Sequence, residues 1–360
     1  MMHSPFRHAG SVLRKGRAIH LTFFLTRRCN LRCPFCFYLN GQEPSAESLH
    51  DLTIEEITKI SSPMGKLLWL AFSGGEIYLR DDLVEISEVF YRNNKPAIML
   101  YPTNGMLPEL IRERTEQILR MCKKSVIAVK LSLDGMKEMH DSLRGKKGSF
   151  DKVMATYHTL EGLMGKYPHF ELGINTVFCS ENQDCMDQII DYVASLKNIR
   201  THTISLIRGN PSREKSKNVD IGKYHNAIGR LEENLKKRIS PTYRFRGGKF
   251  KAAQDILQRR LIHQTTTEQK RVIPCYAGRL NLVLTETGEV SPCELLTTSL
   301  GNIRDYAYNM TDLLDSDAAR DVLRSIEIGQ CYCTHECYFM TNILFNPLLF
   351  PALIREYLQI

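Results

Sequence analysis

The sequence lacks any run of about 18 uninterrupted apolar residues, which a membrane-spanning helix would require. Its first 20 residues also lack the apolar core of a secretory signal peptide. It has no low-complexity tract, and no internal repeat other than an alternation of strand and helix patterns. These absences predict a cytoplasmic globular protein, in which cysteines stay reduced instead of pairing as disulfides.

The sequence lacks a long block of charge of one sign, because its Lys and Arg residues are spread along the chain. The 360 residues include 48 Lys and Arg and 40 Asp and Glu, which gives a net charge of +8. Because the basic residues are interleaved with acidic ones, this charge does not by itself indicate nucleic acid, and no DNA partner is predicted. It is compatible with an anionic substrate, an acidic protein partner or a membrane surface.

The sequence does have 11 cysteines, most of them in two groups. The first group is Cys29, Cys33 and Cys36. The second group is Cys275, Cys293, Cys331, Cys333 and Cys337. In a chain without a secretory signal, clustered cysteines indicate metal binding or redox chemistry. The other three are interpreted as small, partly buried hydrophobic residues.

Between residues 19 and 211, apolar runs alternate with amphipathic segments. The apolar runs are residues 19–25, 67–72, 97–101, 126–133, 170–178 and 203–207. Helical periodicity covers residues 82–93, 110–122, 150–164 and 184–196. This alternation predicts an α/β fold with a parallel sheet. Six units are too few for a closed eight-stranded barrel. We therefore predict a partial, TIM-like (β/α)6 barrel with its active site at the carboxyl ends of the strands.

Five parts of the chain are predicted. They are an N-terminal extension (1–18), the partial barrel (19–211), a basic helical linker region (212–271), a small cysteine-rich module (272–337) and an apolar C-terminal segment (338–360). The linker has helical periodicity in residues 224–238 and 252–263. The module contains a predicted β-hairpin around Thr287 and Gly288.

The first cysteine group directly follows the first predicted strand. Three thiolates at spacings of four and three residues can bind a [4Fe–4S] cluster and leave one iron open for a substrate or cofactor. Zinc and a redox Cys-x-x-Cys pair are the alternatives. Zinc would need a fourth ligand nearby, and none is evident between Phe37 and His50.

The pattern Cys-x-x-x-Cys-x-x-Cys, with Phe35 just before the third cysteine, resembles the radical S-adenosylmethionine (radical SAM) superfamily. The resemblance implies that SAM binds the open iron, beside Phe35, and is reductively cleaved to a 5′-deoxyadenosyl radical. That radical would abstract a hydrogen atom from the substrate. The resemblance also implies an electron donor such as flavodoxin or ferredoxin. In such an enzyme the protein binds and orients, while the cofactors supply the chemistry.

The second and third predicted strands end in motifs similar to those of this family. Gly74, Gly75 and Glu76 follow the second strand, where glycines allow another molecule to approach the backbone. The resemblance implies that they hold the amino group of SAM. Thr103 and Asn104 end the third strand and are predicted to line the same site. Taken singly, each motif is also a common turn signal.

The fourth and fifth strands carry further candidates. Ser132 and Asp134 alternate with apolar residues and therefore share a face, where they suit a ribose or a carboxylate. Arg144 is a candidate partner for a ligand carboxylate, with a structural ion pair to Asp141 as the alternative. Asn175 is predicted to face the ribose.

The second cysteine group resembles the auxiliary-cluster module known as the SPASM or twitch domain. The shared features are a cysteine, a hairpin with Gly288, a second cysteine and a later cysteine group. Five cysteines are too few for the two clusters of the full module. We therefore predict one auxiliary [4Fe–4S] cluster for electron transfer, with Cys275, Cys293, Cys337 and either Cys331 or Cys333 as ligands. His335 is an alternative ligand, and zinc is the alternative metal.

The predicted function is a radical SAM oxidoreductase or transferase that acts on a peptide or a small molecule. The alternatives are an RNA-modifying radical enzyme and a non-catalytic iron–sulfur carrier or scaffold. A fused leader-peptide-binding domain is not expected within the 18 residues before the first strand. Residues 338–360 are predicted either to pack on the open sheet or to contact a membrane surface.

Overall fold

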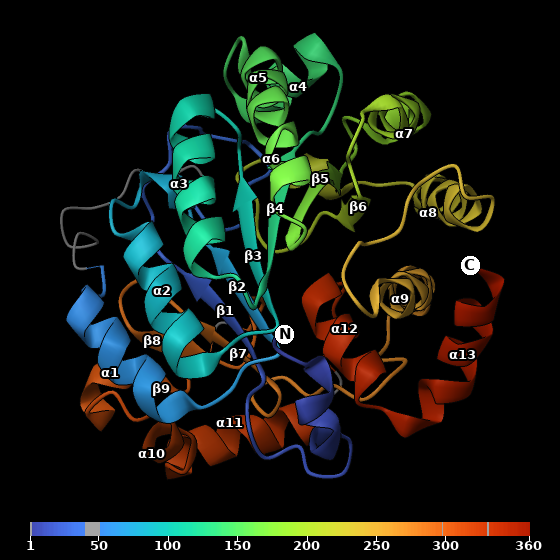
Figure 1. Cartoon of the computed structure of the whole chain (residues 1–360). Coiled ribbons are helices and arrows are strands. Elements are labelled where there is room, and N and C mark those ends of the chain that lie inside the picture. The colour runs from blue at the N-terminus through green and yellow to red at the C-terminus, as the bar shows by residue number, and fades with distance from the viewer. Residues whose placement is uncertain (1, 40–50, 297, 330) are drawn as a thin grey trace.

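A computed structural model describes residues 2–39, 51–296, 298–329 and 331–360 (Figure 1). The described residues form one nine-stranded sheet with the order β6-β5-β4-β3-β2-β1-β7-β8-β9. The strands are β1 His20–Phe24, β2 Trp69–Ser73, β3 Ile98–Thr103, β4 Val126–Ser132, β5 Phe170–Phe178, β6 Thr201–Leu206, β7 Asn281–Leu284, β8 Glu289–Ser291 and β9 Gly301–Asn302. Neighbours from β6 to β7 are parallel, and the last two pairs are antiparallel.

The outer face of the barrel strands is apolar and is covered by helices. Phe23, Phe72 and Val129 pack in one core with Phe90 and Ile118 from helices α2 and α3, which lie along one side of the sheet in Figure 1. The helices of this region are α1 Ile54–Met64, α2 Leu83–Asn94, α3 Pro108–Met121, α4 Lys137–Arg144, α5 Ser149–Glu161, α6 Leu163–Lys166 and α7 Met186–Ser195. The predicted strands correspond to β1–β6, and the predicted α/β partial barrel is confirmed.

The predicted hairpin is the pair β7 and β8. The sequence pattern did not indicate that β7 also pairs in parallel with β1, from His20 opposite Asn281 to Phe23 opposite Leu284. His20 Nδ1 and Asn281 Oδ1 lie 3.0 Å apart in this buried contact. The second cysteine group is therefore attached to the same sheet as the first. Its remaining helices are α10 Met310–Leu314 and α11 Asp317–Ile328.

Helices α8 Ile221–Lys236, α9 Gly248–Glu268, α12 Glu336–Leu344 and α13 Phe350–Gln359 complete the structure. Helices α9 and α12 lie on the open side of the barrel strands, opposite α2 and α3 (Figure 1). Phe339 and Ile343 of α12 join the main core. Packing of this segment on the fold is thus confirmed for α12, and contact with a membrane stays a prediction. Among the described residues, no single helix is long and apolar enough to span a membrane. In this described part of the chain, only α12 and residues Pro347–Gln359 taken together have the necessary length and composition, and the chain bends by 88° between them.

Candidate active site

The first cysteine group lies in the loop after β1, at the carboxyl end of the parallel strands. Cys29, Cys33 and Cys36 line one cavity of about 220 Å³. The predicted residues that line it with them are Phe35, Gly74, Gly75, Glu76, Thr103, Asn104, Ser132, Arg144 and Asn175. The structure therefore brings together every residue predicted for this site except Asp134.

Gly74 and Gly75 allow the cysteine loop itself to approach the end of β2. A Cβ atom on Gly74 would lie 2.5 Å from the Thr26 carbonyl oxygen, and one on Gly75 would lie 2.1 Å from the Arg28 carbonyl oxygen. The Gly75 amide donates to the Thr26 carbonyl at 2.8 Å. The glycines were predicted to admit a ligand, and the structure shows that they first admit the backbone that carries the cysteines.

Glu76 connects this loop to the end of β3. Its side chain is 1% exposed and accepts hydrogen bonds from Thr103 Oγ1 at 2.9 Å and from the Asn104 amide at 2.8 Å. Burial raises the pKa of Glu76 to about 7. Asn104 Nδ2 in turn donates to Asn30 Oδ1 at 2.7 Å and lies 3.8 Å from Cys29 Sγ. The motifs after β1, β2 and β3 thus form one connected network.

Arg144 pairs with Asp134, and the predicted alternative pairing with Asp141 is wrong. Asp141 instead accepts hydrogen bonds from Ser149 Oγ and the Phe150 amide, both at 2.9 Å, at the start of α5. Asp134 is fully buried and also accepts from the Val177 amide at 2.8 Å. It therefore neutralises Arg144 behind the cavity wall and, contrary to the prediction, does not line the cavity.

The paired Arg144 guanidinium lies beside the cysteine loop. It stands 3.9 Å from Cys33 Sγ and 5.2 Å from the centre of the Phe35 ring. Burial raises the pKa of the Cys33 thiol to about 11, and the Arg144 cation opposes this shift. A cation at this position favours the thiolate, which is the form that binds metal.

The donor set fits a [4Fe–4S] cluster with SAM. Three thiols supply soft ligands for iron, and hydroxyl, amide and glycine backbone groups beside them suit a polar organic cofactor. In the described ranges, no three His, Cys, Asp or Glu side chains converge tightly enough to hold a single metal ion.

Residues 23–193 match the model of the radical SAM superfamily. This chain contains a radical SAM domain. The domain of this family binds a [4Fe–4S] cluster and SAM, so the predicted family and these two cofactors are confirmed.

Several curated proteins are similar in sequence to this chain. The subtilosin biosynthesis protein AlbA of Bacillus subtilis is 28% identical over 297 residues, which are 81% of this chain and 58% of AlbA. The sporulation killing factor maturation protein SkfB of the same species is 23% identical, over 92% of this chain and 73% of SkfB. An AdoMet-dependent heme synthase of Methanosarcina barkeri is 26% identical over 79% of both chains. This chain thus spans little more than half of AlbA.

Solved structures share the fold. SuiB of Streptococcus suis, bound to the precursor peptide SuiA, superposes with a TM-score of 0.61 at 15% identity, over 89% of this chain and 70% of SuiB. The structure of anSMEcpe with bound AdoMet gives a TM-score of 0.60 at 19% identity, over 95% of this chain and all of the other. Both likenesses support the partial barrel.

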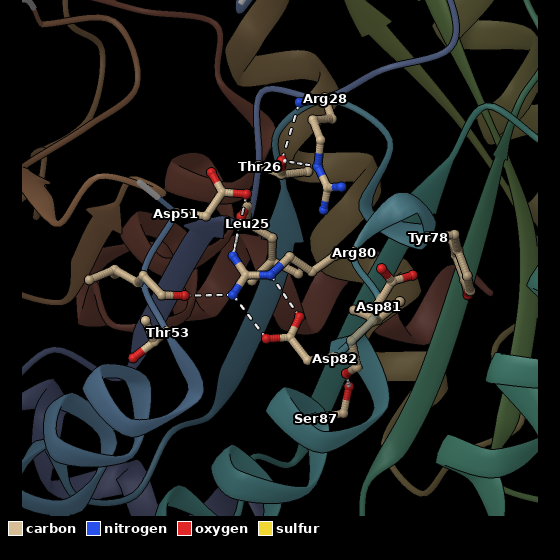
Figure 2. Close-up of polar contacts among 12 residues, drawn as sticks. Leu25, Thr26, Arg28, Asp51, Thr53, Tyr78, Arg80, Asp81, Asp82 and Ser87 are labelled. Atoms are coloured by element: carbon tan, nitrogen blue, oxygen red, sulfur yellow. Dashed lines mark hydrogen bonds and ion pairs between the residues drawn. The ribbon is translucent and has the colours of Figure 1, made fainter. Parts of the chain in front are cut away.

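Arg80 supports the radical SAM site, and the sequence did not single it out. Its side chain is 7% exposed, and Figure 2 shows its contacts beside the end of β1. Its Nη1 donates to the Leu25 carbonyl at 2.9 Å, Nη2 donates to the Leu52 carbonyl at 2.5 Å, and Nε donates to Asp82 at 2.7 Å. Only its position after the Gly-Gly-Glu motif could have suggested this role.

Four of the five later cysteines line a second cavity, of about 140 Å³. They are Cys275, Cys293, Cys331 and Cys333. Burial raises the pKa of Cys333 to about 12 and that of Cys293 to about 11. Arg271 Nη2 donates to Cys331 Sγ at 2.9 Å. These four thiols thus surround one common space.

Cys337 faces a different space. It lines a third cavity, here called the barrel cavity, of about 240 Å³ between the inner face of the strands and helices α9 and α12. Burial raises its pKa to about 12, and the charges that act on it are Glu294, Arg208, Glu336 and Lys251. His335, the predicted alternative ligand, pairs instead with Glu294 through Nε2 and Oε1 at 2.8 Å.

The barrel cavity adjoins the cavity of the three cysteines. Both are lined by Ser73, Pro102, Asn175, Ser205 and Arg208. Arg208 Nη2 lies 3.2 Å from Glu294, and its Nη1 lies 3.4 Å from Glu336. These two carboxylates are adjacent in sequence to Cys293 and Cys337. The sequence did not mark Arg208, because its partners lie about 90 and 130 residues further along the chain.

Proposed function

We propose that this protein is a radical SAM enzyme that removes a hydrogen atom from a substrate held in the barrel cavity. The observation that carries this proposal is the shared wall of two cavities, one lined by three cysteines and the other lying inside the barrel. A substrate in the barrel cavity would meet the cofactors at that wall. Proximity of this kind is the main requirement for hydrogen transfer between two bound molecules.

The residues of the first cavity have distinct roles in this proposal. Cys29, Cys33 and Cys36 would hold the cluster, while Ser132 and Asn175 would contact SAM. When bound, the cluster and SAM supply the one-electron chemistry that removes hydrogen from carbon. The protein orients both reactants and excludes water, and Glu76 and Arg80 keep the cysteine loop in place.

We favour a peptide substrate. AlbA is named as a bacteriocin biosynthesis protein, and SkfB is named as the maturation protein of a sporulation killing factor. The SuiB structure contains a bound precursor peptide. The barrel cavity, at about 240 Å³, is smaller than the roughly 300–1,000 Å³ usual for small-ligand pockets. That volume suits the insertion of one side chain of a peptide whose remainder stays outside.

The test is cleavage of SAM by the anaerobically reconstituted and reduced protein. We expect 5′-deoxyadenosine to form, and to fall to background in Cys33→Ala, because the cluster then loses a ligand. Cys185→Ala is the matched control, since Cys185 lies outside the three cavities. Absence of 5′-deoxyadenosine from the wild-type protein with a full cluster would reject the enzyme and favour an electron carrier or scaffold.

We further propose that one auxiliary cluster is held by Cys275, Cys293, Cys331 and Cys333 and serves in electron transfer. This set differs from the one predicted from sequence, because Cys337 faces the barrel cavity. Four thiols for four irons leave no iron open to substrate.

Iron and sulfide content separates the two ligand sets. Cys333→Ala is expected to lower the iron content by about four atoms per chain, the content of one cluster. Cys337→Ala is expected to keep the wild-type iron content and the electron paramagnetic resonance signals of two clusters. The opposite result would be the loss of one cluster from Cys337→Ala while either Cys331→Ala or Cys333→Ala keeps both clusters. That result would favour the ligand set predicted from sequence, in which Cys337 is a ligand.

A further inference from the structure

Lys130 is a cation of the barrel cavity with no ion pair to any residue that the structure describes. It lies on the inner face of β4, where Ala128, Lys130 and Ser132 point the same way. Ser132 lines the cavity of the three cysteines. Two residues along a strand correspond to about 7 Å, so Lys130 lies roughly that far below the SAM site.

The structure leaves space for the Lys130 ammonium over a glycine. Gly173 of β5 is the register partner of Lys130, and a Cβ atom on Gly173 would lie only 2.7 Å from Lys130 Nζ. The ammonium donates to Thr201 Oγ1, and to Thr203 Oγ1 at 3.3 Å. Hydroxyl groups hold it in place but do not neutralise it.

The acidic groups that face Lys130 are engaged elsewhere. Asp255 of α9 accepts a hydrogen bond from Tyr243 at 2.7 Å and pairs with Lys251. Glu171 of β5 accepts from the Arg244 amide at 2.6 Å through Oε1, and its buried Oε2 has no hydrogen-bond partner among the described residues. Lys251 and Arg259, also on α9, add positive charge near Lys130. His202 on β6 is half-buried, and its pKa is lowered to about 3 by burial and by Lys130.

Burial lowers the pKa of Lys130 to about 7. A half-buried amine without a counter-ion loses part of its hydration, and an incoming anion would offset that cost. The cavity thus has a deep, fixed position for one negative group.

We propose that Lys130 binds a carboxylate of the substrate and so selects a substrate with an acidic group. This inference rests on the proposed function. The carboxylate would enter first and reach Lys130, and the carbon chain behind it would pass Asn175 and Ser205 at the wall shared with the SAM site. In a peptide, the acidic group is a Glu or Asp side chain or the terminal carboxylate.

Three small probes test this in the full-length protein with its clusters assembled. Acetyl-glutamate amide has only a side-chain carboxylate, acetyl-alanine has only a terminal one, and acetyl-glutamine amide is the neutral match of the first. Calorimetric titration is expected to show at least one of the acids binding about tenfold or more tightly than the glutamine probe. The acid that binds identifies the source of the carboxylate.

Lys130→Met is expected to abolish the preference for the acid. Gly173→Ala keeps the Lys130 ammonium but places a methyl group where that ammonium lies, so this variant should weaken the preference for the acid as well. Lys152→Met removes an exposed lysine and is the matched control, and thermal denaturation checks that each variant folds. Equal binding of acid and amide by the wild type, or an unchanged preference in both Lys130→Met and Gly173→Ala, would overturn the proposal. SAM cleavage is measured separately, so a failure of the enzyme proposal is distinguished from a failure of this one.

Discussion

At the scale of single residues, buried charges decide how the site is built. Arg80, Arg144 and Arg208 are three largely buried cations, and each contacts a different part of the cysteine-bearing loops. The sequence marked Arg144 as a partner for a ligand carboxylate and offered Asp141 as the alternative, whereas the structure pairs it with Asp134. Asp134 and Asp141 are both close to Arg144 in sequence, and only the fold shows which carboxylate points toward the guanidinium.

Arg80→Met is expected to lower the free energy of unfolding by about 2–4 kcal/mol, because the Leu25 and Leu52 carbonyls lose their donor and Asp82 loses its counter-ion. Chemical denaturation measures this difference. Arg92→Met is the control. The Arg92 side chain is 73% exposed and, among the described residues, forms an ion pair only with Glu88 along α2, so its loss should cost no more than about 0.5 kcal/mol. Similar losses for the two variants would show that Arg80 is not a central support.

At the scale of elements, the end of β2 and the loop that carries the first three cysteines pack directly against each other. The order of motifs after β1, β2 and β3 could be read from the sequence, because each motif is a short local pattern. Their mutual contacts could not, because Gly74, Gly75 and Glu76 touch residues about 30–50 positions away.

Gly75→Ala is expected to displace the cysteine loop, since the new Cβ would lie 2.1 Å from the Arg28 carbonyl oxygen. We expect a destabilisation of about 1–3 kcal/mol and a partial loss of the iron bound by the first cysteine group. Iron analysis and denaturation measure the two effects. Gly229→Ala is the comparison, because a Cβ on Gly229 of α8 meets no atom within 4 Å. Unchanged iron content in Gly75→Ala would show that the loop adapts without cost.

At the scale of the whole molecule, the two cysteine groups share one sheet and one interior. β7 extends the barrel sheet beyond β1, and the loops around Cys293 and Cys337 place Glu294 and Glu336 in the wall of the barrel cavity. The barrel cavity is therefore lined by residues from both sides of the domain boundary predicted at residue 272. A change in the second cysteine group is therefore expected to alter the proposed substrate site as well as the proposed auxiliary cluster.

The sequence by itself determined the alternation of strands and helices. It also determined the family, through the spacing of the first three cysteines. Both follow from the sequence because periodicity and motif spacing are properties of neighbouring residues. Tertiary structure alone decided the partner of Arg144, the separation of Cys337 from the other four cysteines and the isolated charge of Lys130. Each of these features depends on contacts between side chains from different strands, helices and loops. Those side chains come together only when the sheet and its covering helices have folded.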